Sequence, residues 1–201
     1  MVMSFVYRRV LYSNGVTKWL WNLVRRLIIK IDNEALCAMR VHSKDLIMPL
    51  SHSLPLYLHK LPFYDRLPGR LSKYISVKLN SVKCIDVGAN IGDTINAFKE
   101  PKAFDKHADK DKDVYLAIEP NPRYREYLKL NWGDEQNVVI LPYICSSSDG
   151  NTAACIKELN GTASVILNSN VEDNQQKFEK MTIDSIVNRH SECGNFNLLI
   201  N

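Results

Sequence analysis

The sequence lacks the spacings that identify several common binding sites. Its five cysteines include no Cys-x-x-Cys pair, and its five histidines form no His-Glu-x-x-His or similar pattern. We therefore expect neither a protein-held metal nor a disulfide framework, and a reducing compartment such as the cytoplasm is the default. The formal net charge is only +4, and no long basic run or RNP-like aromatic strand is present, so we expect no nucleic-acid partner.

The signatures of phosphate-containing nucleotides are also missing. The turn at residues 88–93 has Asn90 and Asp93 where a dinucleotide-binding G-x-G-x-x-G needs glycines. No phosphate-cradling G-x-x-x-x-G-K-[ST] occurs. Asp93, at the start of a predicted helix, suits the helix dipole but would repel a pyrophosphate placed there. The turn therefore favours a ligand without phosphates.

Long apolar runs are absent, since none approaches the ~18 residues that a membrane-spanning helix needs. No acid precedes Asp32, whereas six Lys or Arg residues do. Apolar residues at steps of three and four predict an amphipathic helix here, with a stripe of Val16, Trp19, Leu20, Leu23, Val24, Leu27, Ile28 and Ile31. Two interpretations stay open. The stripe packs on the protein body, or the helix lies on an anionic membrane surface with Trp19 and Trp21 at the interface, as a peripheral contact.

The chain divides into three regions by composition. Residues 1–45 form the N-terminal amphipathic helical region, and residues 81–201 carry the alternating pattern described next. Between them, residues 46–80 contain four prolines, at positions 49, 55, 62 and 68. Prolines this frequent divide a chain into short turns and helices, so we expect a packed helical cap that ends in a helix from about Arg70.

After residue 81, apolar strands alternate with helical segments. In chain order we expect a strand at 82–87, a helix from Asp93 to about Lys99 stopped by Pro101, a strand at 114–118, a helix from Pro122 to before Gly133 with Asn121 as N-cap, and a strand at 138–141. Residues 99–113 form a charged, solvated connection. This alternation predicts an α/β fold with a parallel sheet and covering helices.

Two acids and two glycines fall where the first two of these strands end. Gly88 would let the backbone pass close to a ligand, and Gly92 would let the loop turn into the helix. Asp86 could bind an ammonium group, and Glu119 could accept hydrogen bonds from both ribose hydroxyls. S-adenosylmethionine has these groups and no phosphate. The alternative is that both glycines serve only a strand-to-helix turn.

These residues resemble a known family. The runs Ile85–Thr94 ("IDVGANIGDT") and Ala117–Pro122 ("AIEPNP") resemble the FkbM family of S-adenosylmethionine-dependent methyltransferases. Ser53–Leu67 is similar to the segment that precedes the family's catalytic domain, and Met181–Ile186 resembles its Thr-Leu-Asp-Ser-Leu element. The resemblance implies a class I, Rossmann-like methyltransferase sheet that methylates a hydroxyl oxygen on a sugar, a lipid-linked glycan or another small molecule.

The resemblance also implies the cofactor site. It assigns Asp86, Gly88, Ala89, Asn90 and Gly92 to the first cofactor loop, Asp93 and Thr94 to the amino-acid end of the cofactor, and Glu119 to the ribose. The loop at residues 146–149 is a weaker candidate for the adenine side. Asp149, Asp184 and His190 are conceivable bases, but no spacing singles one out, and Asp184 is also typical of a helix-start cap. The catalytic residue therefore stays unassigned.

One departure from the family concerns the last residues. In the family, a strand ending in Lys-Ile-Asp follows at this point, and then an acidic residue followed by glycine. This sequence instead ends with residues 197–201, "NLLIN". We therefore expect a methyltransferase sheet that is incomplete at its C-terminus. Two alternatives stay open: a non-catalytic cofactor-binding or interaction protein, and a nicotinamide-dependent oxidoreductase, which the missing glycines disfavour.

Overall fold

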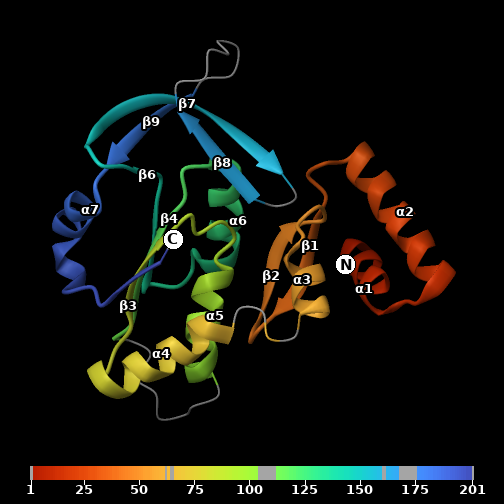
Figure 1. The fold of residues 1–201 in the computed structure, drawn as a ribbon, viewed down its shortest axis with the longest axis horizontal. Coiled ribbons are helices and arrows are strands. Elements are labelled where there is room, and N and C mark those ends of the chain that lie inside the picture. The colour runs from red at the N-terminus through yellow and green to blue at the C-terminus, as the bar shows by residue number, and fades with distance from the viewer. Residues whose placement is uncertain are drawn as a thin grey trace.

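The computed structural model describes residues 2–61, 63, 66–103, 112–159, 162–167 and 176–200 (Figure 1). Most of the expected charged connection, residues 104–111, lies outside the described residues. The N-terminal part contains helices α1 (Val2–Tyr12) and α2 (Gly15–Ile31), strands β1 (Leu36–Val41) and β2 (Lys44–Pro49), and helices α3 (Leu54–Lys60) and α4 (Arg66–Leu79). None of the described helices combines the length and the apolar character needed to cross a bilayer.

The hairpin β1–β2 was not predicted, and it lies across the expected boundary between residues 1–45 and 46–80. Its antiparallel register pairs Leu36 with Pro49 and Val41 with Lys44. The strands are joined at His42, whose φ is +50°. A hairpin is usually signalled by Asn-Gly or Asp-Gly in the turn, and this connection has neither, which explains why the pattern was missed.

The central sheet is parallel and has the strand order β10-β3-β4-β5. Strands β3 (Lys83–Val87), β4 (Val114–Ile118) and β5 (Val138–Leu141) confirm the expected strands to within one residue. Strand β10 (Leu198–Ile200), which was not expected as a separate strand, pairs with β3 on the side opposite β4. The strand order therefore reverses at β3, and open parallel sheets bind ligands at the carboxyl ends of strands beside such a reversal.

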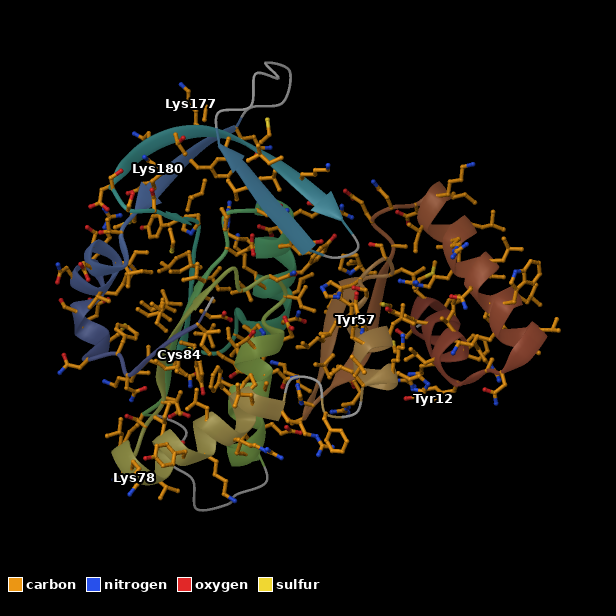
Figure 2. All side chains as sticks on the ribbon, in the orientation of Figure 1. Tyr12, Tyr57, Lys78, Cys84, Lys177 and Lys180 are labelled. Atoms are coloured by element: carbon orange, nitrogen blue, oxygen red, sulfur yellow. The ribbon has the colours of Figure 1, made fainter. Side chains whose placement is uncertain are left out.

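Helices cover both faces of this sheet, as buried parallel strands require. Cys84, Tyr115 and Ala117 share one core cluster with residues of α5 (Asp93–Ala103) and α6 (Pro122–Trp132). On the other face, Ile85 and Leu116 pack in a second cluster together with α7 (Ile183–Arg189). The side chains alternate between the two clusters along each strand. Figure 2 shows Cys84 inside the sheet, whereas Lys78, Lys177 and Lys180 lie at the outer surface.

Helix α6 and its N-cap Asn121 confirm the expectation, but the expected end of α5 was wrong. Pro101 lies inside α5, which continues to Ala103. A proline cannot donate a backbone hydrogen bond to the residue four positions earlier, here Ala97. Helix α4 packs at this point, because a Cβ added to Gly69 would lie 3.2 Å from the Ala97 carbonyl oxygen. The helix therefore tolerates Pro101 where a neighbouring helix covers it.

A second sheet, also not predicted, has the order β6-β9-β7-β8. It contains β6 (Ile144–Cys145), β7 (Gly150–Leu159), β8 (Thr162–Leu167) and β9 (Gln176–Met181). Strands β7 and β8 are antiparallel, whereas β6 and β9 are parallel. This sheet lies beyond the carboxyl ends of β4 and β5, at the top of Figure 1. A short 3-10 turn at Ser191–Cys193 then leads toward β10.

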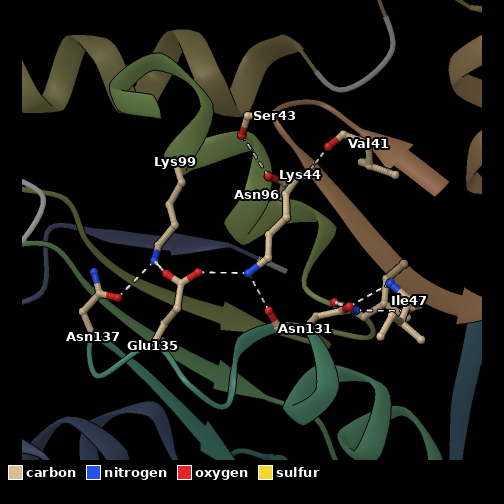
Figure 3. Close-up of polar contacts among 10 residues, drawn as sticks. Val41, Ser43, Lys44, Ile47, Asn96, Lys99, Asn131, Glu135 and Asn137 are labelled. Carbon is tan, nitrogen blue, oxygen red and sulfur yellow. Dashed lines mark hydrogen bonds and ion pairs between the residues drawn. The ribbon is translucent and has the colours of Figure 1, made fainter. Parts of the chain in front are cut away.

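The N-terminal part does not have a core of its own. Tyr7 of α1 and Met48 of β2 belong to the same buried cluster as Tyr115 and Trp132. A polar network also joins the hairpin to α6 (Figure 3). Asn131 accepts from the Ile47 N–H at 2.7 Å and donates to the carbonyl oxygens of Ile47 and Ile91, each at 3.0 Å.

The same network contains two lysines that meet at one carboxylate. Lys44 of β2 donates to the Asn131 carbonyl oxygen at 2.6 Å and pairs with Glu135 at 3.0 Å. Lys99 of α5 binds the other oxygen of Glu135. Both ammonium groups also lie over the Trp132 ring, at 3.9 and 5.2 Å from its centroid. The two lysines and their hydrogen bonds hold the pKa of Glu135 below its usual value, against the effect of burial.

We predict that Asn131→Ala lowers the free energy of unfolding by about 2–4 kcal/mol, because it leaves buried backbone groups of Ile47 and Ile91 without partners. Lys129→Ala is the matched control on the same helix. It removes only an exposed pair with Glu126 and should cost at most about 0.5 kcal/mol. Urea denaturation followed by circular dichroism measures both values. Equal stabilities for the two variants would contradict the role given to Asn131.

Candidate functional site

The loop after β3 has a backbone conformation that ordinary side chains rarely adopt. Gly88, Asn90 and Gly92 have φ angles of +80°, +51° and +82°. The N–H groups of Gly88 and Ala89 both donate to the carbonyl oxygen of Ile118, at 2.8 and 3.0 Å. The loop is therefore attached to the end of the neighbouring strand β4. Glycine is the residue that tolerates positive φ best, and asparagine is among the few others that visit this region routinely.

The two glycines of this loop have different surroundings. A Cβ added to Gly92 would lie 2.1 Å from Trp132 Nε1 and 2.9 Å from Leu128 Cδ1. Gly92 therefore lets the loop pack against α6. A Cβ added to Gly88 would meet nothing within 4 Å. Gly88 thus presents its backbone to open space, where a ligand could approach it closely.

Glu119 connects this loop to the next one. Its side chain is 5% exposed and follows directly after β4. One carboxylate oxygen accepts from the Asn90 N–H at 2.9 Å, and the other accepts from the Asn121 N–H at 2.8 Å. Burial raises the pKa of Glu119, while these two hydrogen bonds act in the opposite direction. The acceptor-only, ionised form is the one that matches two N–H donors.

The second loop is fixed further by contacts with other elements. Asn121 caps α6 by accepting from the Arg123 N–H at 2.9 Å. Its side-chain amide donates to Glu158 of β7 at 2.7 Å, and Arg123 pairs with the other oxygen of Glu158 at 2.8 Å. Arg123 also donates to the Asn33 carbonyl oxygen at 2.7 Å. The second sheet and the N-terminal part therefore both hold the start of α6.

His52 supports the first loop and was missed from the sequence. It lies just after β2, is 5% exposed, and interacts with the Asn90 side chain. Its Nδ1 accepts from the Leu54 N–H at 3.2 Å. Burial lowers the pKa of His52 to about 4, which the interaction with Asn90 opposes and the positive charge of Arg25 reinforces. No spacing marks this histidine, because its partner lies 38 positions later in the chain.

The remaining predicted residues lie next to these loops. Asp86 is 3% exposed, one residue before the end of β3, in register with Ala117 of β4 and Ile200 of β10. Asp93 and Thr94 are the first two residues of α5. All eight residues predicted for the cofactor site thus lie at the carboxyl ends of β3 and β4. Asn90 and Glu119 are in direct contact, and adjacency along the chain or the sheet places the others beside them.

The candidate bases lie elsewhere, on or beside α7. Asp149 accepts from the Thr182 N–H at 2.6 Å and from the Ser185 hydroxyl, and both hydrogen bonds hold its pKa below the usual range. The loop at residues 146–149 is therefore attached to the start of α7. Asp184 lies in the first turn of that helix, and His190 is its C-cap. Within the described ranges, no three metal-ligating side chains form a cluster.

We predict that Gly92→Ala destabilises the protein more than Gly88→Ala. Both changes place a Cβ on a residue with positive φ, at a cost of about 1 kcal/mol. Only Gly92→Ala also forces the Cβ into Trp132, so this variant should lose more than about 2 kcal/mol in free energy of unfolding. Thermal and urea denaturation of the two variants measure the difference. A Gly92→Ala protein as stable as Gly88→Ala would contradict the packing described for this loop.

We predict that His52 makes the protein less stable in acid. The unfolded chain binds a proton near the ordinary histidine pKa of 6.5, whereas the folded chain binds it only near 4. The free energy of unfolding should therefore fall as the pH is lowered from 6.5 to 4, by about 3 kcal/mol for this group. In His52→Asn, which keeps an acceptor near the Leu54 N–H, that part of the pH dependence should disappear.

The comparison requires urea denaturation of wild type and His52→Asn at several pH values. His59→Asn, at an exposed histidine, is the matched control and should follow the wild type. If the free energy of unfolding of wild type and His52→Asn changed with pH in the same way, the burial of a neutral imidazole at this position would be contradicted.

Comparison with known protein families agrees with this geometry. The family model of the methyltransferase FkbM domain matches residues 86–200, more than half of the chain. The match begins at Asp86 and includes the glycine loop, Glu119 and α7. No curated protein matches the chain. The chain therefore belongs to the FkbM methyltransferase family.

Proposed function

We propose that this methyltransferase uses S-adenosylmethionine as its methyl donor and methylates a hydroxyl oxygen on a sugar, a glycan or another small molecule. The single observation that carries the proposal is the Glu119 carboxylate, which is held by two backbone N–H groups at the carboxyl edge of the parallel sheet. The strand order β10-β3-β4-β5 supports a class I, Rossmann-like arrangement, with this edge at the strand-order reversal.

Glu119 retains the capacity to bind a ribose. A carboxylate has roughly four lone-pair sites, two on each oxygen. The N–H groups of Asn90 and Asn121 use one on each oxygen, which leaves one on each for the two ribose hydroxyls. The same two N–H groups fix the direction of the carboxylate. These acceptor sites therefore fit the nucleoside part of the cofactor.

The first loop fits the other end of the cofactor. The open space beside Gly88 allows close approach to the backbone. Asp86 at the end of β3, and Asp93 with Thr94 at the start of α5, provide acids and a hydroxyl for the ammonium of the amino-acid tail. Asp93 would repel a phosphate at this helix start. These features favour S-adenosylmethionine over a dinucleotide.

The protein's contribution to the reaction is mainly positional. The bound cofactor supplies an electrophilic methyl group on its sulfonium. Holding an acceptor hydroxyl in line with that methyl can contribute about 7–11 kcal/mol to barrier reduction, so few dedicated chemical groups are needed. Loops held as firmly as those at Gly88–Gly92 and Glu119–Asn121 suit this task. The acceptor hydroxyl must also lose its proton, and a base within hydrogen-bond reach would assist.

Transfer of a labelled methyl group from S-adenosylmethionine to pools of sugars, glycans and small hydroxyl compounds tests the proposal. Label in a hydroxyl-containing product supports it, whereas cofactor binding without transfer to any pool favours a non-catalytic binding protein. Calorimetry with S-adenosylhomocysteine and NADH separates the oxidoreductase alternative. Binding of NADH without binding of S-adenosylhomocysteine would overturn the proposal.

We predict that Glu119→Ala weakens S-adenosylhomocysteine binding by about tenfold or more, because at least one charge-assisted hydrogen bond is lost. Glu126→Ala, which removes an exposed acid from α6, is the matched control and should bind like the wild type. Isothermal titration calorimetry gives both dissociation constants, and circular dichroism verifies that each variant is folded. Unchanged affinity in folded Glu119→Ala would contradict the assignment of this residue.

A further inference from the structure

Helix α2 carries an apolar face that the protein does not cover. This face contains six residues whose exposed fractions range from 40% to 86%: Val16, Trp19, Leu20, Leu23, Leu27 and Ile31. They include most of the stripe that the sequence predicted. The interpretation in which this stripe packs on the protein body is therefore wrong for these six residues. None of the 17 residues of α2 is fully buried.

The opposite side of α2 is attached to the protein and fixes the direction of the exposed face. Arg25 lies over the Tyr7 ring, 4.5 Å from its centroid, and donates to the Leu50 carbonyl oxygen at 2.9 Å. Ile28, Ile29 and Trp21 pack against the core cluster, so the expectation that Trp21 lies at a membrane interface is wrong. Helix α2 lies at the edge of the molecule, beyond α1 and the hairpin (Figure 1), and its side chains extend outward there (Figure 2).

The charged residues of α2 all have one sign. Arg26 and Lys30 of α2 are exposed, as are Arg8 and Arg9 of α1. Neither helix contains an acid, and the first acid in the chain is Asp32. On a helix with 3.6 residues per turn, Arg26 and Lys30 lie beside Trp19 and Leu23, at the border of the apolar face. An apolar stripe bordered by cations, with an exposed tryptophan, is complementary to an anionic lipid surface.

We propose that α2 attaches this protein peripherally to anionic membranes by lying in the plane of the lipid interface. The helix is about 25 Å long at 1.5 Å per residue. The apolar face spans its whole length, from Val16 to Ile31. Trp19, which is 65% exposed, enters the interface, while Arg26 and Lys30 bind lipid phosphates.

The charge pattern distinguishes a membrane from a second copy of the chain. A second copy would present the same cations to this face and no acid from α1 or α2, so self-association brings like charges together. An anionic bilayer instead offers opposite charge over the entire length of the helix. Self-association is therefore an outcome that the experiment must be able to detect.

Sedimentation of the full chain with lipid vesicles tests the proposal. The protein should pellet with vesicles that mix phosphatidylcholine and phosphatidylglycerol, and much less with phosphatidylcholine alone. Rising salt should weaken the binding, because it screens the attraction between exposed charges. The emission of Trp19 should shift to shorter wavelength on binding, and Trp19→Phe should remove most of that shift.

Two pairs of variants separate the apolar and the basic contributions. Leu23→Gln with Leu27→Gln should reduce vesicle affinity by at least about tenfold, whereas Leu67→Gln with Leu130→Gln, at exposed leucines outside α2, should not. Arg26→Glu with Lys30→Glu should have a similar effect. Lys78→Glu with Lys177→Glu changes the net charge equally at sites outside α2 (Figure 2) and should retain binding.

Three results would overturn the proposal. The first is a wild-type protein that does not bind the mixed vesicles at low salt. The second is equal loss of binding in the α2 variants and their matched controls. The third is a dimer that binds no vesicles and dissociates when Leu23 and Leu27 are replaced, which would assign the face to self-association. Binding of S-adenosylhomocysteine is measured separately, so failure here leaves the proposed function intact.

Discussion

The interaction on which the site depends is the buried carboxylate of Glu119, which accepts one hydrogen bond from the Asn90 N–H and one from the Asn121 N–H. Those two groups belong to different loops, each at the end of its own parallel strand. A charged group inside a protein is costly to bury unless it is hydrogen-bonded, and here two N–H donors offset that cost. The carboxylate therefore fixes the spacing of the loops, and under the proposed function its remaining lone pairs accept from the ribose hydroxyls.

The loops also depend on a part of the chain that the family match does not include. His52, before the matched region, contacts Asn90, and Asn131 links the Ile47 backbone of the hairpin to Ile91 in the glycine loop. Arg123 at the start of α6 reaches the Asn33 carbonyl oxygen. The N-terminal residues thus support the predicted cofactor loops in addition to presenting α2 at the edge of the molecule. Support of this kind keeps a binding site in one geometry before its ligand arrives.

The strands of the parallel sheet could be predicted from local sequence, because each depends on neighbours in the chain. The eight cofactor residues stay a prediction, since several of them rest on the family resemblance. Strand Val114–Ile118 is a continuous apolar run, and Asn121-Pro122 is a strong helix start. Other features depend on distant partners. The hairpin has its turn at His42 without the usual turn residues, and Pro101 stays helical where α4 packs against α5. The interaction between His52 and Asn90 joins distant residues, so no short sequence pattern reveals it.

The sequence also predicted the amphipathic character of α2 without deciding which side faces the protein. Arg25, a charged residue, packs inward over Tyr7, whereas Trp19 and Leu27 face outward. Periodicity locates an apolar stripe, but it contains no information about what covers it. The same limit applies to the bases considered for catalysis. No sequence motif marks Asp149, and its hydrogen bonds with Thr182 and Ser185 become evident only from the fold.

Amide hydrogen exchange at Asn90 and Asn121, measured by NMR on the full chain with and without S-adenosylhomocysteine, tests the central claim most directly. If the Glu119 carboxylate holds both N–H groups and also binds the ribose, both amides exchange slowly in the free protein and more slowly still when the ligand is bound. Rapid exchange at either amide in the free protein, or protection at both that saturating ligand leaves unchanged, would contradict it.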